Sequence, residues 1–166
     1  MMPSLKSAAS LTLTKDPVGL RAWLLPVLSH WLPPFLLSGG IFFMAGDYGS
    51  VAVFHWPATL LQYFFPSWPL QKIFYAVMLI RKILHFLAYA ALFAAYGRAL
   101  RWQFNLGRWP LVLLTLSICL LISGVDEGRQ AFYPSRTGHL GDVLLDMSGA
   151  VTAAAVFWLW LRSKET

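Results

Sequence analysis

The chain is dominated by long apolar runs that contain few or no charged residues. Residues 22–45 include no Asp, Glu, Lys or Arg, and a helix of about 20 apolar residues is long enough to cross the hydrocarbon core of a bilayer. Further runs of this kind cover residues 73–97, 109–125 and 143–161. The sequence therefore predicts an all-α fold, a polytopic membrane bundle with four transmembrane helices.

Composition supports a membrane protein and excludes several other classes. Only 12% of the residues are charged, whereas a soluble domain usually carries about 25%. The net charge is +6, but the basic residues gather at the ends of the apolar runs, as membrane topology requires, so we expect no nucleic-acid partner. Cys119 is the only cysteine, which excludes an internal disulfide and a cysteine zinc site.

The chain is expected to form one domain. A polar tail over residues 1–20 precedes a single membrane domain over residues 21–162. The first residues lack a compact apolar region followed by a small-residue cleavage site, so we expect no cleaved signal peptide. Pro33-Pro34 should kink the first helix, and His30 in the same run is interpreted as an interior histidine with satisfied hydrogen bonds.

Residues 47–71 are apolar but differ from the four runs. Pro57, Pro66 and Pro69 interrupt this segment, and its aromatic side chains resemble those that gather at the membrane–water interface. We expect an interfacial or partly re-entrant segment. A distorted transmembrane hairpin is the alternative.

The distribution of basic residues predicts the orientation. With four spans, one side of the membrane receives eight Lys and Arg residues and the other receives five. This bias favours a cytoplasmic location for both termini. The eight are Lys6, Lys15, Arg21, Arg98, Arg101, Arg108, Arg162 and Lys164, and the five are Lys72, Arg81, Lys82, Arg129 and Arg136.

Polar residues on different spans are predicted to lie at one depth. At a rise of about 1.5 Å per residue, Lys82 lies about 24 Å from Arg98 along its helix, and Asp142 lies about 30 Å from Arg162. Asp126 lies about 27 Å from Arg108 if its helix continues past residue 125. If these arginines mark one membrane surface, the polar residues all reach the opposite boundary of a core about 30 Å thick.

Helical spacing also predicts which side chains face each other. Lys82, His85 and Tyr89 lie on one stripe of a helix, and Asp142 and Asp146 lie on one stripe of another. We expect the basic stripe to pack against the acidic one. Internal salt bridges that fix helix pairing are one interpretation, and a polar cavity open to the outside is the other.

Two segments resemble the signatures of the VanZ-like family of membrane proteins. The first is Lys82-Ile83-Leu84-His85-Phe86-Leu87-Ala88-Tyr89, which is similar to the K-x-x-H-F-x-x-Y pattern. The second runs from Asp126 to Ala150, and the resemblance extends over residues 70–160. Many relatives carry Asn where this chain has Asp146. The second signature comprises Asp126, Glu127, Gln130, Phe132, Pro134, Arg136, Asp142, Asp146, Gly149 and Ala150.

The resemblance implies a small helical bundle with a role in the cell envelope. The family is named for an accessory protein of glycopeptide-antibiotic resistance that is linked to teicoplanin tolerance. It implies a location in the bacterial cytoplasmic (inner) membrane. It does not specify a reaction.

Three functions are compatible with these residues. The first is binding or handling of an envelope lipid or an antibiotic-related ligand in an outward-facing polar cavity, where Lys82, Arg136 or Arg81 could hold a phosphate. The predicted ligand-binding residues are Lys82, His85, Tyr89, Asp126, Glu127, Gln130, Arg136, Asp142 and Asp146.

The second function is a membrane-embedded hydrolase or transferase that acts on a lipid-linked substrate. His85 with Asp142 or Asp146 would then form an acid–base pair, although the chain lacks a G-x-S-x-G nucleophile motif and Ser123, Ser135 and Ser148 are ordinary candidates. No cofactor or metal is expected; a divalent cation on Asp126, Glu127, Asp142 and His85 is a weaker alternative. The third function is a scaffold for a partner membrane protein.

Overall fold

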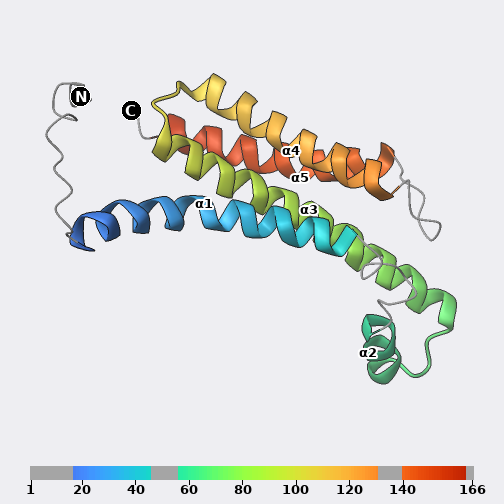
Figure 1. Cartoon of the computed structure of the whole chain (residues 1–166). Coiled ribbons are helices and arrows are strands. Elements are labelled where there is room, and N and C mark those ends of the chain that lie inside the picture. The colour runs from blue at the N-terminus through green and yellow to red at the C-terminus, as the bar shows by residue number, and fades with distance from the viewer. Residues whose placement is uncertain (1–16, 46–55, 131–139, 164–166) are drawn as a thin grey trace, which may run out of the picture.

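The protein is an all-α bundle, as the sequence predicts. The computed structural model describes residues 17–45, 56–130 and 140–163, and it contains no β-strand within them (Figure 1). Four of its helices are long and apolar enough to cross a membrane. In chain order the helices are α1 (Pro17–Ala45), α2 (Trp56–Phe64), α3 (Leu70–Gln103), α4 (Arg108–Gln130) and α5 (Leu140–Arg162).

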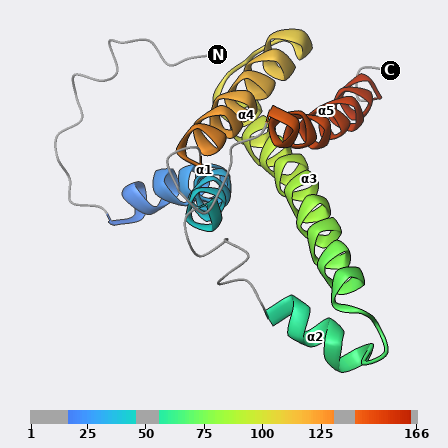
Figure 2. The ribbon, with the colours of Figure 1, turned by 90° about the vertical axis from the view of Figure 1, so that its right-hand side faces the viewer.

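Helix α3 is the centre of the bundle because it contacts each of the other helices. Its most extensive contact is with α5, while α4 packs on both α5 and α3, and α1 lies along the remaining side of α3 (Figures 1 and 2). Tyr89, Leu92 and Phe93 of α3 are fully buried in the core. The core-forming part of α3 thus begins at Tyr89, the last residue of the first signature.

A glycine permits the closest contact between α3 and α5. A Cβ atom built on Gly149 of α5 would lie 3.0 Å from the carbonyl carbon and 3.2 Å from the Cα of Phe86, and closer still to its carbonyl oxygen. These atoms belong to the backbone of α3, so they cannot rotate away as a flexible side chain would. Gly149 therefore sets how closely the two helices approach.

Helix α1 continues through three prolines, Pro26, Pro33 and Pro34, instead of being interrupted by them. Pro33 has no N–H to donate to the carbonyl oxygen of Ser29 four residues earlier. That oxygen accepts a hydrogen bond of 2.6 Å from Nη2 of Arg98 on α3. A proline in one helix is thus compensated by an arginine from another, which donates to the carbonyl that the proline leaves free.

His30 is satisfied locally, in agreement with the prediction. Its Nδ1 lies 2.8 Å from the carbonyl oxygen of Pro26, and its ring stacks on Trp102 with a centroid distance of 4.6 Å. His30 thereby connects α1 with the end of α3 and does not face the polar cluster described below.

Two helices extend beyond the apolar runs from which they were predicted. Helix α3 begins at Leu70 and ends at Gln103, so it includes Arg98 and Arg101, which follow the apolar run of residues 73–97 and were expected in a short basic loop with Arg108. Helix α4 continues past residue 125 to Gln130, which meets the condition stated for the depth of Asp126, and it therefore contains Asp126 and Glu127. At about 1.5 Å per residue, α3 is about 51 Å long, longer than a hydrocarbon core of about 30 Å.

The short helix α2 cannot cross a membrane on its own. It has 9 residues, against the 20 or so that a span requires, and it contacts only α3 among the described helices (Figure 2). Trp56, Tyr63 and Phe64 are exposed on it. The location of residues 47–71 at the interface stays a prediction, and residues 46–55 lie outside the described part of the chain, as do residues 1–16.

Replacing Gly149 by alanine should destabilise the bundle. The added methyl group would collide with the backbone of Phe86, and overpacking of this kind costs about 1–3 kcal/mol. Thermal unfolding of the detergent-solubilised protein should show a lower midpoint. Gly124→Ala on α4 is the matched control, because a Cβ there meets nothing within 4 Å; equal midpoints for the two variants would contradict the close contact.

Candidate functional site

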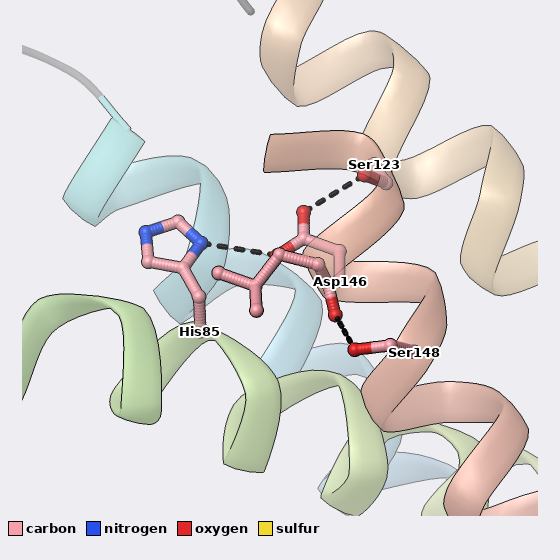
Figure 3. Close-up of polar contacts among 5 residues, drawn as sticks. His85, Ser123, Asp146 and Ser148 are labelled. Atoms are coloured by element: carbon pink, nitrogen blue, oxygen red, sulfur yellow. Dashed lines mark hydrogen bonds and ion pairs between the residues drawn. The ribbon is translucent and has the colours of Figure 1, made fainter. Parts of the chain in front are cut away.

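The site is built around the carboxylate of Asp146 on α5, which is fully buried. Its Oδ2 accepts a hydrogen bond of 2.8 Å from Oγ of Ser123 on α4. Its Oδ1 lies 3.2 Å from Nδ1 of His85 on α3 (Figure 3). A buried carboxylate is strongly disfavoured unless it is paired and hydrogen-bonded. Asp146 therefore connects three helices through both of its oxygens.

The contact with Asp146 determines which nitrogen of His85 is available. An ionised carboxylate can only accept hydrogen bonds, so Nδ1 must carry the proton in this contact. Nε2 is then the nitrogen that can exchange a proton or bind another group. In Figure 3 this edge of the ring points away from Asp146 and toward α1. The side chain of His85 is 27% exposed.

His85 lies at the wall of a cavity between α1 and α3. The cavity has a volume of about 670 Å³, within the range of about 300–1,000 Å³ typical of small-molecule sites. Most of its wall is apolar, and the polar side chains in it come from α3 and α4. The apolar part comprises Pro33, Leu36, Leu37, Gly40, Ile41, Met44, Leu84 and Ala88, and the polar part comprises Arg81, His85, Tyr89 and Asp126.

Tyr89 contributes a buried hydroxyl to this wall. The residue is fully buried, and its hydroxyl lies close to Ser123 and to the carboxylates of Asp146 and Asp126. It nevertheless makes no hydrogen bond of acceptable geometry with any described residue. A buried hydroxyl without a partner is unfavourable, and among the described residues the hydroxyl of Tyr89 is in this condition.

The cationic residue of the cavity is Arg81, not Lys82. Lys82 is exposed and does not line the cavity, whereas the partly buried Arg81 does. Arg81, His85 and Tyr89 are spaced by four residues, so they follow one stripe of α3. The sequence alone is compatible with either Lys82 or Arg81 on the stripe that contains His85 and Tyr89. The regular spacing of four residues from Arg81 to His85 to Tyr89 was the signal that could have identified Arg81 as the residue in the cavity.

The remaining acidic residues lie near the site with different surroundings. Asp126 and Glu127 of α4 are buried, and both interact with another part of the chain. Asp142 lies half-buried in the first turn of α5 and has no ion pair with a described residue. The basic stripe of α3 was expected to pair with the acidic stripe of α5. Among the described residues, the ion pair that forms between them joins His85 and Asp146, and it does not involve Lys82 or Asp142.

Two predicted residues are not placed by the structure. Arg136 lies outside the described residues, as does the side chain of Gln130 at the end of α4. Arg129, one residue earlier, donates a hydrogen bond of 3.3 Å from Nη1 to the carbonyl oxygen of Phe42. This contact connects the end of α4 with α1.

Ser123 is the residue whose function the sequence did not reveal. It was one of three ordinary serine candidates, and only the structure shows it bonded to Asp146. Ser148, another candidate, is exposed and donates to the carbonyl oxygen of Leu145 in its own helix at 2.6 Å (Figure 3). Ser135 lies outside the described residues.

The described residues do not assemble the metal site that was considered as an alternative. Among them, no group of three or more His, Cys, Asp or Glu side chains lies close enough together to hold a metal ion. Asp126, Glu127, Asp142 and His85 therefore do not form one ligand set in this part of the chain.

Removing the hydroxyl of Ser123 should destabilise the protein. Ser123→Ala would leave Oδ2 of the buried Asp146 without its donor, and such a loss costs about 1–3 kcal/mol. Unfolding in detergent by a chemical denaturant would measure the change. Ser117→Ala is a control on the same helix, because Ser117 is exposed and bonds only its own backbone; if it proved equally destabilising, the contact with Asp146 would not be the cause.

Comparison with known proteins identifies the family. The family model described as VanZ/LLP1 matches residues 23–161. No curated protein matches the chain, and no solved structure matches it. The matched region covers α3 and α4 in full, α1 from residue 23, α5 up to residue 161, and all residues that line the cavity. The chain is thus a membrane protein that belongs to the VanZ/LLP1 family.

Proposed function

We propose that this protein binds a membrane lipid with an anionic headgroup in the cavity between α1 and α3. The observation that carries the proposal is the arrangement of the wall, which is apolar along α1 and polar where His85 and Arg81 lie. A hydrocarbon chain would be buried against Leu36, Leu37 and Ile41, because apolar surface favours an apolar neighbour. The headgroup would meet the polar side chains.

Arg81 supplies the charge that favours an anion. It lines the cavity and makes no ion pair with a described residue. A guanidinium can donate two parallel hydrogen bonds to a phosphate, which gives both affinity and orientation. The apolar wall favours a lipid over a glycopeptide-related ligand, because a glycopeptide carries many polar groups that this wall would leave unpaired.

The opposite end of the bundle supports the orientation in which the polar part of the cavity faces outward. Arg101 stacks over Trp160 at 5.0 Å, and Arg162 stacks over Trp158 at 5.7 Å. Arginine and tryptophan gather at membrane interfaces, and arginine is enriched on the cytoplasmic side. We infer that both termini are cytoplasmic and that the cavity serves the outer face of the bacterial cytoplasmic membrane.

Native mass spectrometry can test the binding of the lipid. The wild type, released gently from detergent, should retain an anionic phospholipid, and Arg81→Gln should weaken its retention about tenfold or more, as expected for a hydrogen bond to a charged group. Lys82→Gln should have a smaller effect, because Lys82 does not line the cavity. Equal retention by Arg81→Gln and the wild type would refute the assignment of the headgroup to Arg81.

Filling the cavity offers a second test. Gly40 lines the cavity and Gly39 does not, and a Cβ at either glycine meets nothing within 4 Å. Gly40→Phe should therefore exclude the lipid while Gly39→Phe retains it. Lipid extraction followed by quantification per mole of protein would compare the two variants, and equal lipid content would place the lipid elsewhere.

A further inference from the structure

The second nitrogen of His85, Nε2, makes no hydrogen bond with the residues that the structure describes. Nδ1 satisfies Asp146, and this is the only hydrogen bond of His85 with a described residue. Nε2 belongs to a half-buried ring that lines a mostly apolar cavity. A side chain that served only to hold α3 against α5 would not require a basic nitrogen at this wall. The position instead suits proton transfer to or from a bound molecule.

The groups around the ring resemble the support of a general base. Asp146 holds the Nδ1 proton and would stabilise the imidazolium that forms when Nε2 takes up a second proton. Ser123 in turn fixes Asp146 by its hydrogen bond of 2.8 Å. The partnerless hydroxyl of Tyr89 lies in the same wall, where it could donate to an oxygen on which negative charge develops.

The order of these side chains along α3 matches the order of groups in a glycerophospholipid. Arg81, His85 and Tyr89 all line the cavity, and successive members are about 6 Å apart along the helix. A phosphate held by Arg81 would place the glycerol and its acyl ester beside His85 and Tyr89. The acyl chain would continue along the apolar wall of α1.

We propose that the His85–Asp146 pair hydrolyses an acyl ester of a glycerophospholipid bound in this cavity. The proposal rests on the lipid binding proposed above. Water attacks the ester carbonyl carbon and gives a proton to Nε2 of His85, while Tyr89 donates a hydrogen bond to the carbonyl oxygen as it becomes negative. The bond between the carbonyl carbon and the glycerol oxygen then breaks, and Nε2 returns the proton to that oxygen. The products are a fatty acid and a lysophospholipid.

Phosphatidylglycerol in nanodiscs is the probe for this activity. Incubation in ¹⁸O-labelled water should yield lysophosphatidylglycerol and a fatty acid with one ¹⁸O atom, detected by mass spectrometry. His85→Gln should lower the rate about 100-fold or more, the contribution of a general base. His30→Gln, the same chemical change outside the cavity, should retain the wild-type rate.

Tyr89→Phe provides a variant with little risk of unfolding, because it removes only a hydroxyl that has no partner among the described residues. It should slow hydrolysis and leave the bound phosphatidylglycerol in place. If His85→Gln fails to fold, the rate of lysophosphatidylglycerol formation is measured for Tyr89→Phe and Asp146→Asn instead, and both should be slower than the wild type. A rate unchanged by these substitutions would overturn the proposal.

Measurement of bound lipid in the same samples separates this proposal from lipid binding. A wild type that retains phosphatidylglycerol but forms no lysophospholipid would overturn the hydrolytic activity and leave the binding function standing. A wild type that neither retains nor cleaves phosphatidylglycerol would refute both. Cleavage without ¹⁸O in the fatty acid would also overturn the proposed step, since water would not be the attacking group.

Discussion

The arrangement of the bundle depends on a carboxylate that is buried where no water can solvate it. Asp146 needs two donors, and it obtains one from α3 and one from α4. Those contacts require α5 to approach α3 closely, which Gly149 allows because it has no side chain. The polar pair and the small residue therefore act together: the glycine permits the approach, and the buried charge makes helix pairings without His85 and Ser123 unfavourable.

The family signatures acquire a physical meaning in this structure. In the first signature, His85 and Tyr89 line the cavity. The backbone of Phe86 in the same signature packs against Gly149, which belongs to the second signature. Asp126 and Asp146 of the second signature are both buried. The two signatures thus contain the residues that form the contact between α3 and α5 and the polar wall beside it. Through this contact, residues about 60 positions apart in the chain form one site.

Helix α1 gives the site its apolar half. It has few buried side chains and lies along α3, and the cavity occupies part of the space between them. Its prolines free backbone carbonyls, and one of these is satisfied by Arg98 of α3. Nearer the C-terminal end of α1, Arg129 of α4 donates a hydrogen bond to the carbonyl oxygen of Phe42. Arginines of two other helices thus hold α1 at its middle and near its C-terminal end, and most of the α1 residues that line the cavity lie between these two contacts.

The sequence by itself determined the number of spans and the set of polar residues at one end of the bundle, because hydropathy and helical rise are local properties. Tertiary structure decided which of those residues meet. Arg81 and Lys82 are neighbours but point about 100° apart on a helix, and only packing against α1 selected Arg81 for the cavity. Ser123 bonds to Asp146 because of the face that α4 turns toward α5 in the packed bundle. The periodicity of residues within one helix does not specify which face meets a neighbouring helix.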